Sequence, residues 1–202
     1  MDRRTTGRRE DAAEGYALFA TAIGACAICW GGRGILAVAL PEASEARLRA
    51  RLERRFPQAS EAEPPAAIAA VIADIAALLA GQHRDLRDAP LDFAGLSEFE
   101  QRALALAREI GPGETATYGD LAARAGAPGA ARAVGAAMAA NPFPIIVPCH
   151  RVLGARGAIG GFSAPGGRDA KARLLNIERA RVGGEPALFD DLGVSLDPRT
   201  RR

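Results

Sequence analysis

The sequence predicts an α/β fold for residues 15–95, followed by a mostly helical fold for residues 96–181. Three observations support this prediction. Apolar runs typical of β-strands lie between Tyr16 and Leu40 on either side of the turn "GGRG". Two stretches with helical spacing of apolar residues follow before residue 81. The second half then shows a series of helix-start signals with short connections between them. The 202 residues, 49% of them hydrophobic, suffice for one large domain or two small ones.

The composition of the chain predicts where the two folded regions begin and end. A connector rich in Gly, Pro and charges places the boundary near Gly95. Residues 1–14 contain arginines but no continuous apolar core, so we expect a disordered extension. Residues 182–202 have too little apolar content to fold alone, and we expect a flexible tail.

The first half is predicted to contain a hairpin and two helices. The hairpin comes from the runs on either side of "GGRG". Residues 42–56 carry Leu48 and Leu52 at helical spacing among charges, and Pro57 ends this amphipathic helix. Residues 65–80 predict a buried helix with Pro65 in its first turn and Gly81 after its last.

The second half begins with a helix that Ser97 and Glu100 open as a capping box and that runs to Gly111. The last helix covers residues 168–180, and its apolar face comprises Ala172, Leu175 and Ile177.

Between these two helices the spacing predicts a helix-turn-helix. Thr117 and Asp120 open its first helix, and Gly126 ends it. Pro128 opens the second helix and Asn141 closes it. Small residues dominate this second helix, so its backbone could approach another surface closely, although tight packing on a core explains them equally well.

Charge is distributed unevenly along the chain. Residues 10–100 hold 8 arginines and 14 acids, a balance of −6, whereas residues 124–181 hold 9 basic residues and 2 acids, a balance of +7. The second half therefore suits a polyanion such as a nucleic-acid backbone, although a solvated surface would look similar. We predict no membrane segment, because no apolar stretch reaches the roughly 18 residues that one needs.

Cysteine and histidine are scarce, and Cys149 stands out in "IIVPCHRVLG". It could be a nucleophile, a metal ligand or a buried apolar residue. A thiol needs help to ionise, and His150 with Glu178 as its partner could supply a base by the logic of a catalytic triad. Cys26 and Cys29 spell C-x-x-C, but residues three apart on a strand point to opposite faces, so we predict no metal site.

Two long stretches carry a family resemblance. "NPFPIIVPCHRVLGARGAIGGFSAPGGRDAKARLLNIE" resembles the active-site segment of the methylated-DNA–protein-cysteine S-methyltransferases, the O6-alkylguanine-DNA alkyltransferase family. "GETATYGDLAARAGAPGAARAVGAAMAANP" resembles the family's DNA-binding helix-turn-helix. Together they cover roughly residues 96–180, and residues 16–95 resemble the less distinctive N-terminal domain.

The resemblance implies a fold and an activity. It implies a ribonuclease H-like N-terminal α/β domain with a small antiparallel sheet, and a winged helix-turn-helix domain that binds DNA and carries the active-site cysteine. It also implies DNA repair by direct reversal: one irreversible, stoichiometric transfer of an alkyl group from O6 of guanine, and also O4 of thymine, to Cys149. The alternative is a non-catalytic alkylated-DNA-binding or regulatory helix-turn-helix protein.

The implied partner is double-stranded DNA containing O6-alkylguanine. No cofactor and no metal are implied. We expect a cytoplasmic monomer that keeps its thiols reduced and does not bind membranes.

Each matching residue receives an implied role. The catalytic set is Cys149 as acceptor, His150 and Glu178 as base and orienter, Tyr118 as donor to the departing guanine, and Asn141 as a brace for the turn. The DNA-binding set is Arg132, which replaces the extruded base, with Tyr118, Thr117, Ala131, Gly135 and Arg151. The substrate-pocket set is Val152, Gly161, Phe162 and Ser163.

Overall fold

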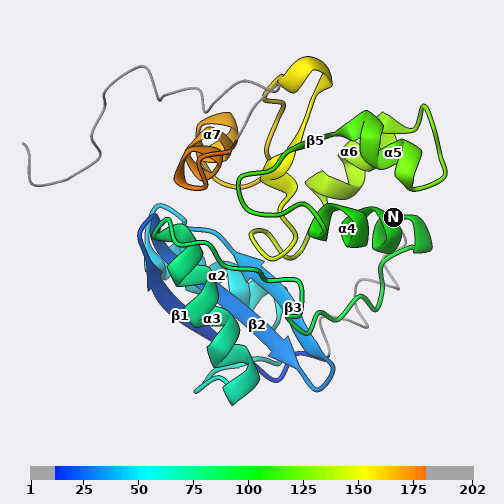
Figure 1. Ribbon diagram of the computed structural model, residues 1–202. Helices are drawn as coiled ribbons and strands as arrows, with labels where there is room; N and C mark the ends of the chain where they lie inside the picture. The colour runs from blue at the N-terminus through cyan, green and yellow to red at the C-terminus, as the bar shows by residue number, and fades with distance from the viewer. Residues whose placement is uncertain (1–11, 181–202) are drawn as a thin grey trace, which may run out of the picture.

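The computed structural model describes residues 12–180 and contains a sheet half, residues 12–95, and a helical half, residues 96–180 (Figure 1). Residues 1–11 of the predicted extension and the whole predicted tail lie outside the described residues. Ala13 is buried and the Glu14 amide donates to the Trp30 carbonyl at 2.9 Å, so the ordered chain begins before residue 15.

The sheet has four strands in the order β3-β2-β1-β4. The strands are β1 (Gly15–Thr21), β2 (Gly24–Gly31), β3 (Gly34–Ala39) and β4 (Ser60–Glu61). The first three are antiparallel neighbours, as predicted, whereas β4 pairs with β1 in parallel and makes the sheet mixed. The predicted hairpin at "GGRG" joins β2 to β3, but the apolar run before it is two strands, not one. They are separated by a turn at Ala22 and Ile23, which carries no Pro or Asn signal.

The two faces of the sheet bury separate clusters of side chains. Ala27 and Cys29 of β2 join the cluster against α2 (Glu45–Arg55), which contributes Leu48 and Leu52. Cys26 and its neighbours Ile28 and Trp30 join the larger cluster on the opposite face, against α3 (Ala66–Leu79). The alternation of a strand thus separates Cys26 from Cys29, as predicted.

The helical half begins with α4 (Glu98–Arg108), opened by the predicted Ser97–Glu100 capping box. The helix-turn-helix pair is α5 (Tyr118–Arg124), capped by Thr117 and Asp120, and α6 (Ala131–Ala139). The prediction that Pro128 opens the second helix was wrong. Gly129 adopts a left-handed φ of 89°, which interrupts the chain between Pro128 and the first helical residue.

The remaining elements complete the helical half. They are the short parallel pair β5 (Ala116–Thr117) and β6 (Val152–Leu153), the 3-10 helices η1 (Cys149–Arg151) and η2 (Ala155–Gly157), and α7 (Gly167–Ile177). The apolar face predicted for α7 was partly wrong, because the buried residues of this helix are Lys171, Leu174 and Leu175.

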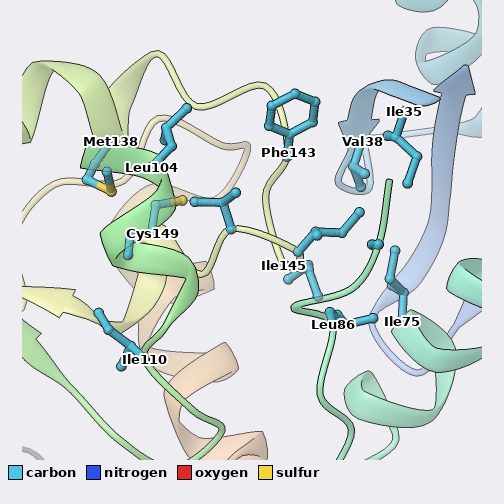
Figure 2. Close-up of a cluster of buried hydrophobic side chains, with 14 of the residues drawn as sticks. Ile35, Val38, Ile75, Leu86, Leu104, Ile110, Met138, Phe143, Ile145 and Cys149 are labelled. Carbon is cyan, nitrogen blue, oxygen red and sulfur yellow. The ribbon is translucent and has the colours of Figure 1, made fainter. Parts of the chain in front are cut away.

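One hydrophobic cluster continues from the sheet half into the helical half. Figure 2 shows Phe143 and Ile145 between Val38 on the strand side and Leu104 on the helix side. The backbone follows the same path, since the Val38 amide donates to the Pro142 carbonyl at 2.9 Å. The chain just before Cys149 is therefore held from both halves. No helix among residues 12–180 is long and apolar enough to cross a membrane.

Candidate active site

The turn that leads into Cys149 is fixed by Asn141. The side-chain amide of Asn141 donates to the Val147 carbonyl at 2.9 Å, and its carbonyl oxygen accepts the Phe143 amide at 2.9 Å. The Cys149 amide in turn donates to the Val147 carbonyl at 2.8 Å. Asn141 thus bonds to the backbone at both ends of the turn, at Phe143 and at Val147, and fixes the position at which η1 begins.

Ile145 adopts an uncommon backbone conformation in this turn. Its φ is 75°, in the left-handed region that β-branched residues avoid. The side chain is buried between the two halves of the molecule (Figure 2). Such a conformation persists only where packing over-determines it, so the surrounding core holds the chain in this shape just before the reactive cysteine.

Cys149 lies at the N-terminus of η1 with 5% of its surface exposed. Burial raises the pKa of its thiol, while a hydrogen bond with Asn141 and the positive charge of Lys171 act in the opposite direction. Burial prevails, so the resting thiol keeps its proton. A reaction at sulfur therefore requires a nearby base.

A buried cluster behind the cysteine provides that base. The His150 imidazole Nε2 lies 3.0 Å from the Glu178 carboxylate oxygen Oε1. Arg151 donates to the same carboxylate through Nε at 2.7 Å and Nη2 at 2.8 Å, and its Nη1 donates to the Ile110 carbonyl at 2.6 Å. Glu178 caps the C-terminus of α7, so this helix brings the carboxylate to the residues of η1.

The electrostatics of the cluster fix the histidine tautomer. Burial acts to raise the pKa of Glu178, but the hydrogen bonds and charges of His150 and Arg151 outweigh it and lower that pKa to about 2. An ionised carboxylate only accepts, so Nε2 of His150 carries the hydrogen. Burial lowers the pKa of His150, and the neutral ring presents an unprotonated Nδ1, which has no hydrogen-bond partner among the described residues.

Lys171 is a functional candidate that the sequence reasoning missed. It is fully buried, and its Nζ donates to the Val152 carbonyl at 2.6 Å and to the Tyr118 hydroxyl at 3.5 Å. Burial lowers the pKa of Lys171 and raises that of Tyr118. A signal was available, because Lys171 is the only lysine among the 26 lysine and arginine residues of the chain.

Cys149 opens onto a cavity of about 350 Å³, which we call the Tyr118 cavity. Its walls are Tyr118 of α5, Gly135 and Met138 of α6, and the segment Gly161, Phe162 and Ser163. Three of the four predicted pocket residues therefore meet at the cysteine. The fourth, Val152, is fully buried, does not line this cavity, and uses its carbonyl to hold Lys171.

The predicted DNA-binding residues divide into two groups. Arg132 is exposed on α6, beside Ala131, and Gly135 lies one turn further on the same helix. Thr117 caps α5. Arg151, by contrast, is buried and committed to Glu178 and Ile110, so the prediction that it contacts DNA was wrong. Its guanidinium belongs to the cluster behind Cys149.

The described residues contain no group of three or more His, Cys, Asp and Glu side chains arranged to hold a metal ion. Cys26 and Cys29 lie in the two separate clusters of the sheet, and His83 is exposed in the connector.

Comparison with known proteins matches residues 98–180 to the model of the 6-O-methylguanine DNA methyltransferase DNA-binding domain. A methylated-DNA–protein-cysteine methyltransferase of Mycolicibacterium paratuberculosis is 44% identical over 128 residues, 63% of this chain and 75% of the relative. One from Methanothermobacter thermautotrophicus is 35% identical over 158 residues, 78% of this chain and 81% of the relative. The chain belongs to the methylated-DNA–protein-cysteine methyltransferase family.

Solved structures agree with the family assignment. The crystal structure of Mycobacterium tuberculosis O6-methylguanine methyltransferase superposes with a TM-score of 0.65 at 34% identity, over 87% of this chain and 99% of the other. The M. tuberculosis OGT in complex with DNA gives a TM-score of 0.62 at 33% identity, over 81% and 91%. The similarity to these structures therefore extends beyond the helical half into the sheet half.

Proposed function

We propose that this protein repairs DNA by direct reversal, moving an alkyl group, chiefly methyl, from O6 of guanine to Sγ of Cys149. The observation that carries the proposal is the position of Cys149: it lies in the wall of a cavity beside α6, with the His150–Glu178 pair buried behind it. The thioether that results is stable, so each molecule acts once, and O4 of thymine is a second substrate.

The proton of the thiol passes to His150. Nδ1 of His150 is the free basic site of the cluster, and neighbouring side chains such as those of Cys149 and His150 diverge, so a bridging water carries the proton between them. The ionised Glu178 orients the ring and stabilises the imidazolium that forms. Sulfur then attacks the alkyl carbon as the bond to O6 breaks.

Tyr118 assists the departing guanine. Tyr118 lines the same cavity as Cys149, and its hydroxyl donates a hydrogen bond to N3, which offsets the negative charge that develops as the alkyl group leaves. Lys171 acts through Tyr118 and is a positioning residue. Its ammonium lies 5.6 Å from the Tyr118 ring centroid and holds the hydroxyl and the Val152 carbonyl in one place.

The DNA must release the base for this reaction, because a cysteine with 5% exposure in a cavity wall cannot reach O6 inside a duplex. The exposed Arg132 on α6 fills the space that the extruded base leaves. Ala131 and Gly135 keep the surface of this helix small enough to enter the minor groove. The basic balance of residues 124–181 supports backbone contacts in the same half.

The guanine is recognised by its edge. The segment Gly161–Phe162–Ser163 walls the cavity, and we assign Ser163 to contact with O6 of the extruded guanine. The Cys149 carbonyl already accepts the Val152 amide and uses its second lone pair for the guanine amino group. The same role for the Val152 carbonyl requires its second lone pair, because Lys171 occupies one.

The finer architecture follows the family. We assign residues 15–95 to a ribonuclease H-like domain and residues 96–181 to a winged helix-turn-helix domain, with β5 and β6 as the wing-like pair. We expect a cytoplasmic monomer.

A purely DNA-binding regulator is the alternative, and the Escherichia coli transcriptional activator/DNA repair enzyme Ada is 36% identical over 84% of this chain and 46% of its own length. The buried His150–Glu178 pair, next to Cys149 in the chain, favours catalysis.

The decisive experiment uses duplex DNA with labelled O6-methylguanine. We expect wild-type protein to accept one methyl group per molecule on Cys149, located by peptide mass spectrometry. Cys149→Ala should accept none, while still binding the duplex in a mobility-shift assay. Repeated turnover, or label on the alanine variant, would contradict the proposal.

A further inference from the structure

Arg156 adopts a backbone conformation that arginine rarely takes. It lies in η2 with φ 57° and ψ 29°, in the left-handed region where the Cβ of an L residue is crowded. The chain otherwise uses glycine for such positions: ten of the described glycines have positive φ, against three described residues of other types, Ile145, Arg156 and Arg179. Strained conformations of this kind concentrate where function or packing requires them.

Packing accounts for Ile145, which is buried, but not for Arg156. The Arg156 side chain is exposed and makes no hydrogen bond or ion pair with the other described residues. Backbone bonds close the turn around it, since the Gly154 amide donates to the Ala158 carbonyl at 2.8 Å and the Ala158 amide donates to the Ala155 carbonyl at 3.3 Å. These bonds use no side chain at position 156, so glycine would fit the turn with less strain.

The fold places this turn, residues 154–158, beside the start of α5. β6 pairs with β5 in parallel, and Leu153 lies opposite Thr117, the cap of α5. η2 follows β6 directly and contacts β5. After the turn the chain returns to Tyr118, because a Cβ at Gly160 would lie 3.8 Å from the Tyr118 Oη. Arg156 is therefore at the tip of a short loop whose two ends lie against Thr117 and Tyr118.

The same loop leads into the wall of the Tyr118 cavity, which begins one residue after Gly160 with Gly161. A base extruded into this cavity brings the phosphates on either side of it to the cavity rim. The loop that carries Arg156 begins and ends at that rim. An exposed cation on it is thus placed for the DNA backbone rather than for the base.

Arginine suits such a contact, because its planar guanidinium keeps its charge and offers two parallel hydrogen bonds to a phosphate. Phosphate contacts fix the register of a protein on a duplex. We infer that Arg156 is a positioning residue that binds a backbone phosphate beside the extruded nucleotide, and that the chain keeps the strained arginine for this contact. The inference rests on the proposed function, which brings the extruded base to Tyr118.

Arg156→Gly should change stability and DNA binding in opposite directions. Glycine relieves the crowding at Cβ, so the thermal midpoint should rise by about 2 °C. Affinity for an unmodified duplex should fall about two- to fivefold, the range of an exposed ion pair. The slope of log affinity against log salt, measured by fluorescence anisotropy, should become shallower by about 0.9, the value for one phosphate contact. A merely structural role would not change this slope.

Two further substitutions at the same position separate charge from backbone strain. Arg156→Lys keeps both, so it should retain most of the salt slope and gain no stability. Arg156→Gln keeps a long side chain but loses the charge, so it should repeat the loss of affinity and slope without the rise in midpoint. This variant keeps the binding test informative even if the glycine variant folds poorly.

Arg179→Gly is the matched control. Arg179 is also exposed, has a φ of 51°, and makes no hydrogen bond or ion pair through its side chain to the other described residues. It follows Glu178 at the end of α7, and neither residue lines the Tyr118 cavity. We expect its replacement to raise the thermal midpoint as Arg156→Gly does, while affinity and salt slope stay at the wild-type values.

Methyl transfer provides the second readout. Arg156→Gly should lower the second-order rate constant for O6-methylguanine in duplex DNA about two- to fivefold, the same range as the loss of affinity. The rate with free O6-benzylguanine should not change, because this substrate has no phosphate.

The outcomes separate the two proposals. If wild-type protein fails to accept methyl from duplex DNA, the proposed function is wrong. If it accepts methyl but Arg156→Gly and Arg156→Gln bind DNA with wild-type affinity and salt slope, only the present inference is overturned. Equal losses of affinity in Arg156→Gly and Arg179→Gly would also overturn it, because general attraction between positive charge and DNA would then explain the effect.

Discussion

Arg151 and Glu178 form a buried ion pair through two hydrogen bonds, 2.7 Å from Nε and 2.8 Å from Nη2. The side chains are 5% and 3% exposed, so water compensates neither charge. Without Arg151, the carboxylate that orients His150 would remain charged in a dry environment with one partner fewer. We therefore expect the arginine to support the proposed base through Glu178.

Replacing Arg151 should strongly lower the stability of the protein. We expect Arg151→Met to lower the free energy of unfolding by about 3–5 kcal/mol, because it leaves a buried charge uncompensated. Urea denaturation monitored by circular dichroism measures the change. The matched control is Arg102→Met, which breaks an exposed pair with Glu98 and should cost less than ~1 kcal/mol. Equal losses in both variants would contradict a special role for the buried pair.

Stability should fall on acidification in two stages. The pKa of His150 is lowered by burial, and that of Glu178 is lowered to about 2, so in acid the unfolded chain binds more protons than the folded one. The loss should begin below about pH 6.5, where unfolded histidine protonates, and continue from about pH 4.3 downward for the glutamate.

Urea midpoints measured between about pH 3 and pH 8 test this expectation, with Glu178→Gln as comparison. The variant should lose the lower stage, and its slope below about pH 4.3 should be shallower than that of wild type. A wild-type slope of the opposite sign would contradict the assigned shifts.

Lys171 should matter through Tyr118 and Val152. Lys171→Met keeps most of the side-chain volume but leaves the Val152 carbonyl without its 2.6 Å partner. We expect a loss of about 1–3 kcal/mol in stability and slower methyl transfer.

A double-mutant cycle with Tyr118→Phe separates the positioning role of Lys171 from general damage. If Lys171 acts by positioning the Tyr118 hydroxyl, its removal should slow transfer less in the Tyr118→Phe background than in wild type. Strictly additive effects on the rate would speak against the link.

Arg132 should affect duplex substrates selectively. Its side chain is exposed on α6 and makes no hydrogen bond or ion pair with the other described residues. Arg132→Ala should therefore not disturb the fold. We expect weaker repair of O6-methylguanine in duplex DNA but a much smaller loss with free O6-benzylguanine, which needs no extrusion. Similar losses on both substrates would argue against the replacement of the extruded base.

The sequence predicted individual helices and their caps better than it predicted how the elements pair and pack. The two capping boxes, at Ser97 and Thr117, depend on residues three apart and appear in the structure as predicted. The parallel strand β4 was missed, because two residues carry no periodicity and their pairing depends on β1, more than 40 residues earlier in the chain. Local signals thus fix local structure, whereas pairing is decided by the assembled core.

The same limit explains the errors at the site. An arginine beside "PCH" fits DNA binding as well as it fits a buried ion pair, and only the position of Glu178 at the end of α7 decides between them. Lys171 was hidden for a related reason: a charged residue is assigned to the solvent face of a helix unless its partners are known. These partners, Val152 and Tyr118, come from other elements of the fold.

The solitary lysine has a practical consequence for chemical labelling. Reagents that acylate primary amines find one side-chain target in this chain, and it is fully buried. Modification of Lys171 under native conditions would therefore require α7 to detach, and its rate would report that opening directly.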